Sequence, residues 1–347
     1  MRILSAHRAL VMAETIGTFH SELSSGGIWI IANPIAGGHG ARRRLDSAVA
    51  LLKSRLTIHE IRWTKRRGDA EQWAREAAAH NVALIIGSGG DGTINELANG
   101  LAGSEVALGI LPAGTANVIA CELGIPFDPT AAANCLLNGK IERVNIGRAE
   151  YQPLPGTEPV AQRPSASAFS SSSFILHPSS FRFFLFAAGL GFDAYVCHRV
   201  DLGLKRWGRK AAYIIAGLRL FLRYQSPRLQ VALDGGPPVS CSELIVANIR
   251  SYGGRFQIAP DASFHKPDLD ACLFSRPGRW NLLRYALGIM RGTHVKYPDV
   301  IYRKAQSVEV STDRPVYLQL DGDTVGTAPA RFTVHPSALS VVTPTNP

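Results

Sequence analysis

The chain has 347 residues, of which 46% are hydrophobic and 18% are charged, and its formal net charge is +10. This length suits two domains, and the composition is ordinary for a soluble globular protein. The five cysteines form no Cys-x-x-Cys pair, which argues against a zinc site or a disulfide framework. The positive charge favours a nucleotide, a nucleic acid or an acidic membrane surface as partner, although a solvated basic surface needs none.

The first 27 residues contain no clean apolar core, because Glu14 and Glu22 interrupt them. We interpret residues 1–27 as a flexible extension rather than a signal peptide. No uninterrupted apolar run in the sequence is long enough to span a bilayer.

Residues 28–148 alternate strand and helix patterns, and three of the strands end in glycine-rich turns that open helices. This alternation predicts a parallel sheet with helices on both faces. Ligands of such sheets lie beyond the carboxyl ends of the strands, so the three turns should lie together. The strands and their turns are 28–32 with 33–40, 82–88 with 89–93, and 107–111 with 112–117.

The middle turn, Gly89-Gly-Asp-Gly-Thr93, combines features that a phosphate site needs. Its glycines allow backbone N–H groups to approach an anion, and the helix that follows presents its positive end. The embedded carboxylate of Asp91 can face a metal ion or a substrate hydroxyl. The turn therefore predicts a nucleotide site, while a tight strand-to-helix connection is the alternative interpretation.

Helix starts are marked by capping patterns. The pairs Asp69 with Gln72 and Thr93 with Glu96 have the spacing of a capping box. Asp128, followed by a proline, predicts another N-cap.

After residue 148 the pattern changes. Residues 149–180 are rich in Pro, Ser and Ala and predict a flexible insertion. Residues 181–343 contain short strand patterns separated by turn signals, which predict an antiparallel β-sandwich. Helix patterns near 210–224 and 279–291 interrupt it. The expected strands are 181–190, 228–233, 243–248, 269–274, 307–311, 316–320 and 330–334.

Five motifs occur in a fixed order along the chain: Asn33-Pro34 with its glycines, Gly89–Asn95, Leu111–Asn117, Ala188–Ala194 and Asp321-Gly-Asp323. With this ordered set, the chain resembles the diacylglycerol-kinase catalytic family, which includes bacterial lipid kinases and sphingosine kinases. The Gly-Gly-Asp-Gly-Thr turn alone would also suit NAD kinases or phosphofructokinases. The motif that contains Thr115 and the one that contains Asp323 favour the lipid branch.

The resemblance implies ATP-dependent phosphorylation of a lipid hydroxyl in a cleft between two domains. Residues 28–148 would form an α/β nucleotide domain similar to NAD kinase and phosphofructokinase, and 181–343 the lipid domain. Asp193 matches a position near the lipid head group, and Asp323 matches the glutamate general base. The positions that match the family's nucleotide contacts, or shape that pocket, are Asn33, Thr64, Gly89, Gly90, Asp91, Gly92, Thr93, Ile94, Asn95 and Thr115.

Phosphoryl transfer needs charge neutralisation and a base for the incoming hydroxyl. Mg²⁺ would arrive with ATP, and Asp91 is the candidate metal ligand. At position 323 an aspartate replaces the family's glutamate, which withdraws the carboxylate by about 1.5 Å; a shift of this size can cost about a hundredfold in rate. Asp91 is therefore a rival base, and Asp321-Gly322-Asp323 can also be read as a simple hairpin turn.

Other positions keep two interpretations. Asp193 can bound a helix, and Thr64 and Thr115 can serve as turn hydroxyls. Lys266-Pro267 stand where many bacterial relatives have Asp-Gly and hold a structural Mg²⁺; lysine cannot ligate that ion, which leaves Asp268 as a candidate.

The expected partners are a lipid substrate and a membrane surface, contacted by the basic and apolar stretch 205–224. That stretch can equally be a packed helix with extended arginines. We expect a cytoplasmic, peripherally membrane-associated protein that binds no nucleic acid, with a homodimer left open. The alternatives are a NAD kinase-like enzyme and a catalytically weak nucleotide- or lipid-binding protein.

Overall fold

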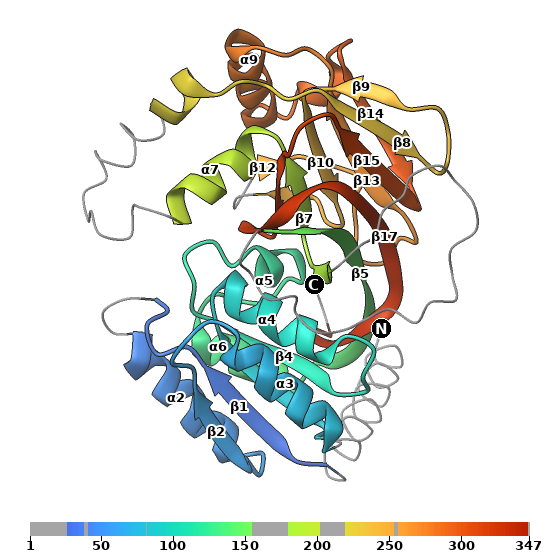
Figure 1. The fold of residues 1–347 in the computed structure, drawn as a ribbon. Coiled ribbons are helices and arrows are strands. Elements are labelled where there is room, and N and C mark those ends of the chain that lie inside the picture. The colour runs from blue at the N-terminus through green and yellow to red at the C-terminus, as the bar shows by residue number, and fades with distance from the viewer. Residues whose placement is uncertain are drawn as a thin grey trace, which may run out of the picture. The chain divides into compact units, whose positions relative to one another are not determined.

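The computed structural model describes residues 26–37, 41–80, 82–154, 180–201, 219–252 and 256–345. The chain divides into two compact units (Figure 1). Unit 1 is Met1–Asn145 with Pro336–Pro347, and unit 2 is Ile146–His335. Most of the extension 1–27 and of the insertion 149–180 lies outside the described residues.

Unit 1 contains a parallel sheet, as predicted. Its order is β2-β1-β3-β4, and the end of β17 adds a further parallel strand beside β4. β3 and β4 are buried along their whole length because helices cover both faces of such a sheet. The strands are β1 (Ile28–Ala32), β2 (Glu60–Trp63), β3 (Leu84–Gly89), β4 (Ala107–Pro112) and β17 (Asp323–Thr343).

The helices of unit 1 pack in two pairs, α3 with α4 and α2 with α6 (Figure 1). Right-handed connections between parallel strands place the helix that follows β1 on the opposite face from those that follow β2 and β3. The helices are α2 (Ala41–Lys53), α3 (Asp69–Ala79), α4 (Asp91–Leu101), α5 (Val118–Glu122) and α6 (Pro129–Leu137).

One capping prediction is confirmed and two are wrong. Asp69 and Gln72 form no capping box, because α3 begins at Asp69 with Gly68 as its N-cap. The Asp128 side chain accepts a hydrogen bond from the Ala131 N–H at 2.8 Å, as an N-cap does. The Thr93–Glu96 capping box does not form, because α4 begins at Asp91 with Gly90 as its N-cap. Glu96 lies beyond the first turn and instead accepts from the Gly68 N–H at 3.0 Å, at the start of α3. It therefore ties two neighbouring helices together.

Unit 2 is antiparallel, as predicted. One run of strands has the order β14-β13-β10-β7-β16-β17, and β17 continues through β15 and β8 to β9. Side chains from both runs share one hydrophobic core, in which the Phe184 and Phe332 rings meet edge to face with centroids 6.2 Å apart. The strands are β5 (Lys140–Pro153), β6 (Ser180–Phe184), β7 (Ala187–Leu190), β8 (Leu229–Leu233), β9 (Val239–Cys241), β10 (Glu243–Ala247), β13 (Leu269–Phe274), β14 (Val300–Ala305), β15 (Ser307–Thr312) and β16 (Tyr317–Leu320).

Short elements complete unit 2. β11 and β12 form a separate two-stranded ladder, and the predicted helix near 279–291 is confirmed as α9. Of the helix predicted near 210–224, only residues 219–223 are described as helical, and the basic stretch 205–218 lies outside the described residues. The remaining elements are α7 (Phe192–Asp201), β11 (Ser251–Tyr252), β12 (Phe256–Gln257), α9 (Arg279–Met290) and the 3₁₀ turn η1 (His294–Lys296).

Three boundaries differ from the sequence interpretation. Strand 181–190 is broken into β6 and β7, because the Asp321 carboxylate accepts the N–H groups of residues 185–187. Residues 149–153, expected in the insertion, continue β5, and those up to Tyr151 pair with β6. Residues 336–343, expected in the second domain, belong to unit 1, where Ser340 and Val341 pair with β4.

Candidate functional site

The turns singled out in the sequence meet at the carboxyl edge of the unit 1 sheet. The backbone hydrogen bonding of the sheet continues beyond the ends of the strands into the turns, and it holds the turns side by side. The bonds are Asn33 N to Ser88 O at 2.8 Å, Thr64 N to Ala32 O at 2.9 Å and Ala113 N to Gly89 O at 2.9 Å. The first residues of four turns therefore lie in register with one another.

Two glycines of these turns touch across the sheet edge. A Cβ on Gly114 would lie 2.5 Å from the Gly90 Cα, and one on Gly90 would lie 3.2 Å from the Gly114 Cα. Both positions therefore require glycine for packing. Gly92 is different, because a Cβ there would meet nothing within 4 Å. Its missing side chain leaves open space at the start of α4.

Asp91 is held by backbone N–H groups. Its Oδ1 accepts from the Ile119 N–H at 3.3 Å, which links the start of α4 to α5. Burial raises the pKa of this carboxyl, and the hydrogen bonds from Ile119 and Val118 partly offset the rise. Among the described residues, no group of three His, Cys, Asp or Glu side chains could hold a metal ion. A nucleotide brings its own ion, which keeps several waters, so the single carboxylate of Asp91 could serve as its protein ligand.

The predicted nucleotide-binding side chains do not all face the same way. Asn33 Nδ2 donates to Thr93 Oγ1 at 3.4 Å, which connects the first turn to the second. Ile94 is buried, next to the position where Gly87 lacks a side chain. Asn95 is buried as well, and its Oδ1 accepts from Asn99 Nδ2 at 3.2 Å. Ile94 and Asn95 can therefore reach a ligand only through their backbone.

A cavity of about 230 Å³ lies between the first and third turns, and Thr115 is the predicted nucleotide-binding residue that lines it. Its wall also includes Asn117, which the sequence analysis did not select. Asn117 has a φ of 49°, accepts from the Gly114 N–H at 2.8 Å and donates to the Gly114 carbonyl at 3.0 Å. Asparagine tolerates this left-handed conformation better than most residues do. An asparagine at the end of the glycine turn is therefore the sequence feature that could have identified this position.

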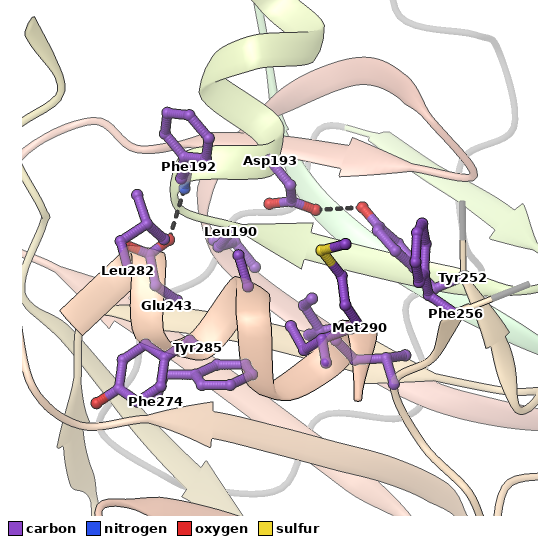
Figure 2. Close-up of a pocket in the computed structure, with 14 residues that line it drawn as sticks. Leu190, Phe192, Asp193, Glu243, Tyr252, Phe256, Phe274, Leu282, Tyr285 and Met290 are labelled. Carbon is purple, nitrogen blue, oxygen red and sulfur yellow. Dashed lines mark hydrogen bonds between the residues drawn. The ribbon is translucent and has the colours of Figure 1, made fainter. Parts of the chain in front are cut away.

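In unit 2, Asp193 lies at the start of α7 and belongs to a network of half-buried and buried polar groups, of which Figure 2 shows Asp193 and Tyr252. Its Oδ2 accepts from the Tyr252 hydroxyl at 2.6 Å and from Gln319 Nε2 at 3.0 Å. Burial raises the pKa of Asp193, and these hydrogen bonds work against the rise. Gly189 makes room for the pair, since a Cβ there would lie 2.1 Å from Asp193 Oδ2.

Gln319, which the sequence analysis did not select, connects Asp193 to the Asp321-Gly322-Asp323 turn. Its Oε1 accepts from the Gly322 N–H at 2.7 Å, while its Nε2 donates to Asp193. The side chain is fully buried on β16. The candidate head-group residue and the candidate base turn are thus joined through one amide.

The Asp321-Gly322-Asp323 turn is a hairpin between β16 and β17. Asp321 and Gly322 have φ angles of 51° and 87°. The Asp321 carboxylate accepts from the N–H groups of Leu185, Phe186 and Ala187 at 2.6, 2.9 and 3.0 Å. Asp323 is the first residue of β17 and pairs with Leu320. Asp321 is therefore structural, and the role of Asp323 as base stays a prediction.

Beside Asp193, unit 2 contains a largely apolar cavity of about 330 Å³ (Figure 2). A second carboxyl in its wall, Glu243, accepts from the Phe192 N–H at 2.5 Å and from the Tyr224 hydroxyl at 2.9 Å. Burial raises the pKa of Glu243 to about 8. The lining residues are Leu190, Phe192, Asp193, Glu243, Ile245, Tyr252, Phe256, Ile258, Phe274, Leu282, Tyr285, Ala286, Ile289 and Met290.

The loop that the family resemblance associates with a structural Mg²⁺ contains an ammonium group here. Lys266 Nζ donates to the carbonyl oxygen of Asp261. Asp268 Oδ1 in this loop and Asp270 Oδ2 at the start of β13 are buried without a hydrogen-bond partner. Burial raises the pKa of Asp270, while the hydrogen bond from Tyr302 and the charges of Lys304 and Lys266 work against the rise. The lysine thus supplies positive charge to the loop.

Comparison with known proteins agrees with this geometry. Residues 27–149 match the diacylglycerol kinase catalytic domain, and residues 187–343 match the YegS C-terminal NAD kinase beta sandwich-like domain. A diacylglycerol kinase from Mycobacterium tuberculosis is 30% identical over 325 residues, which cover 92% of this chain and 96% of that protein. A diacylglycerol kinase from Bacillus subtilis is 28% identical over 321 residues, with 91% and 95% covered.

The chain belongs to the diacylglycerol kinase catalytic family. This confirms the predicted family and enzyme class, a lipid kinase. A crystal structure from Bacillus anthracis has the same fold, with a TM-score of 0.71 at 23% identity, covering 92% of this chain and 96% of the other. The predicted α/β unit and β-sandwich are therefore both confirmed. Within the described ranges, no helix is sufficiently long and apolar for a membrane span.

Proposed function

We propose that this kinase transfers the γ-phosphate of ATP to a hydroxyl of a diacylglycerol-like or sphingoid-like lipid. The observation that carries the proposal is the apolar cavity in unit 2, whose wall holds Asp193. Asp193 is tied through Gln319 to the turn that carries Asp323. An apolar cavity with a few converging polar groups suits a ligand that has one polar end.

ATP would bind at the sheet edge of unit 1. α4 begins at Asp91, and the first N–H groups of a helix have no partner within it, so they can donate to phosphate oxygens. The open space beside Gly92 allows a phosphate to approach the backbone. Mg²⁺ carried by ATP would neutralise the phosphates, and Asp91 would face that ion directly or through water.

The lipid chain would occupy the apolar cavity, with its hydroxyl toward Asp193 and the β16–β17 turn. Asp323 would take the proton from the hydroxyl as its oxygen attacks the γ-phosphorus and the bond to ADP breaks. Gln319 positions Asp193 and the turn without touching the reacting atoms. We also propose that the enzyme works from the cytoplasm at a membrane surface, because its lipid substrate is held there.

A second candidate function is favoured by one observation. Position 323 carries aspartate where the family has glutamate, and a shorter side chain suits a catalytically weak protein that binds nucleotide or lipid. ATP binding without phosphate transfer to any lipid would support this alternative.

The test is labelled ATP with a panel of extracted lipids, applied to the wild type, Asp323→Ala, Asp323→Glu and Asp91→Asn. We expect Asp323→Ala and Asp91→Asn to lose turnover and Asp323→Glu to retain it. Full turnover by Asp323→Ala would show that this residue is only part of a turn. Turnover of NAD in place of lipid would replace the proposed acceptor.

A further inference from the structure

α9 has two apolar faces. One face packs over the cavity, which Leu282, Tyr285 and Ile289 line. A second set of apolar side chains follows at intervals of three or four residues on the outer side of the helix. We call it the α9 stripe; its members and their exposed fractions are Trp280 at 83%, Leu283 at 42%, Leu287 at 39% and Met290 at 63%.

The surroundings of the stripe are cationic. α9 contains no acidic residue, carries Arg279 and Arg284, and is followed by the exposed Arg291. Arg284 forms an ion pair with the buried carboxylate of Asp299, so the positive charge beside the stripe comes from Arg279 and Arg291. Arg279 Nη1 donates to the Leu222 carbonyl at 3.1 Å, and the Leu222 side chain is 54% exposed, which extends the apolar surface beyond the first turn of α9. Exposed apolar groups beside arginines, with a tryptophan among them, suit the interface of an anionic bilayer.

The stripe is continuous with the cavity. Met290 belongs to the stripe and also lines the cavity, and Phe256 lines the cavity while 41% exposed. Figure 2 shows α9 running across the front of the cavity, with Met290 and Phe256 among the side chains that line it. An acyl chain could therefore pass from a bilayer along these two side chains without crossing water.

We propose that the α9 stripe inserts into the interface of an anionic lipid bilayer and that the substrate reaches the cavity beside Met290 and Phe256. The substrate route rests on the proposed lipid-kinase function, whereas the insertion of the α9 stripe does not. A bilayer fits better than a second protein chain, because Arg279 and Arg291 lie at the two ends of α9 and complement anionic head groups.

The first experiment is sedimentation with phosphatidylglycerol–phosphatidylcholine vesicles in the absence of ATP. The triple variant Trp280→Ser, Leu283→Ser, Leu287→Ser should bind at least about tenfold more weakly, because three exposed apolar side chains are removed from the interface. The matched control Trp280→Phe, Leu283→Met, Leu287→Met should bind like the wild type. Vesicles of phosphatidylcholine alone should bind the wild type more weakly.

A second measurement locates the surface without a destabilising change. Vesicles whose acyl chains carry bromine should quench a part of the tryptophan fluorescence that Trp280→Phe lacks. Equal quenching in the wild type and Trp280→Phe would overturn the proposal. Undiminished vesicle binding by the triple variant would also overturn the proposal. So would a triple variant that changes from dimer to monomer while it still binds vesicles, because the stripe would then be a contact between two copies of the chain.

The kinase activity is measured separately. With a short-chain, water-soluble diacylglycerol, the triple variant should turn over like the wild type, while with long-chain lipid in vesicles its rate should fall by about the factor lost in binding. If no lipid is phosphorylated but vesicle binding depends on the stripe, the proposed function fails and the membrane surface stands. Equal activity loss on both substrates would overturn the proposed route of access.

Discussion

Glycines at the carboxyl edge of the unit 1 sheet have two distinct environments. Gly90 and Gly114 are in mutual contact and leave no room for a Cβ, whereas Gly92 borders open space. Packing explains the first two, and the proposed approach of a phosphate would explain the third. A change from glycine to alanine should therefore affect the stability of the fold at Gly90 and Gly114, and the binding of a ligand at Gly92.

We predict that Gly92→Ala weakens ATP binding by about tenfold or more, because the added methyl group occupies space next to the α4 backbone. The free energy of unfolding should stay the same or rise by about 0.5–1 kcal/mol, since alanine is the better helix residue. Isothermal titration and urea unfolding measure the two quantities. An unchanged ATP affinity would contradict the proposed phosphate site.

Gly100→Ala is the matched control on the same helix. Its Cβ would lie 2.5 Å from both the Ala74 Cβ and the Glu71 carbonyl, where α4 packs on α3. We expect this variant to lose stability, by about 1–3 kcal/mol for an overpacked contact, and to keep its ATP affinity wherever it folds.

The buried carboxyl of Glu243 predicts a pH dependence of stability. Its pKa in the folded protein is about 8, against an ordinary value of 4.5. Between these values the folded state holds a proton that the unfolded chain has lost, so this group makes the protein less stable as pH rises through that window. The slope for one proton is about 1.4 kcal/mol per pH unit.

Glu243→Gln should remove the contribution of about one proton from the slope of unfolding free energy against pH, because an amide does not titrate. Its oxygen can still accept from the Phe192 N–H, and its NH₂ group can donate to the Tyr224 hydroxyl. Urea unfolding at a series of pH values measures the slope. The charge of Asp193 also raises the pKa of Glu243, so Asp193→Asn is the companion variant that separates the two carboxyls. Identical slopes would show that Glu243 does not titrate in this window.

At the scale of elements, the β16–β17 hairpin separates two aspartates that the sequence presents as equivalent. Asp321 accepts three backbone N–H groups and breaks the chain between β6 and β7. Asp323 begins β17 one residue beyond the glycine. Stability and turnover should therefore depend on different members of one motif.

We predict that Asp321→Ala lowers the free energy of unfolding by at least about 3 kcal/mol, since three backbone donors lose their acceptor. Asp323→Ala should abolish turnover and change stability by less than about 1 kcal/mol. Chemical denaturation and the lipid kinase assay measure the two effects. A large loss of stability in Asp323→Ala would mean that both aspartates hold the hairpin.

Patterns within a single strand and its turn could be predicted from the sequence, because they depend on neighbouring residues. The parallel strands of unit 1, the glycine turns and the Asp128 cap belong to this class. Gln319 and Glu243 could not be identified, since both lie in strands that read as apolar. Gln319 meets Asp193 across 126 positions of sequence, a contact that no local pattern reports.

At the scale of the whole molecule, unit 1 is not one continuous segment. The sequence interpretation ended the last strand at Val334, before His335-Pro336, but β17 continues to Thr343. Its final residues pair with β4, and Leu339 and Val342 are buried there. The strand continues beyond Pro336 because it pairs there with a different partner, β4.

We predict that Leu339→Ala destabilises unit 1 by about 2–5 kcal/mol, the usual cost of emptying a buried leucine site. Amide hydrogen exchange should accelerate in β3 and β4, which belong to unit 1. Exchange in β10 and β13, within unit 2, serves as the control and should change less. Faster exchange confined to β10 and β13 would contradict the assignment of this segment to unit 1.

The path of β17 has a consequence for biosynthesis. Domains usually fold as they leave the ribosome, the N-terminal one first. Here the strand that closes the N-terminal sheet beside β4 is translated after the whole of unit 2. The edge of β4 therefore stays unpaired until the last residues of the chain are translated, and unit 1, the proposed site of ATP binding, should be the last unit to mature.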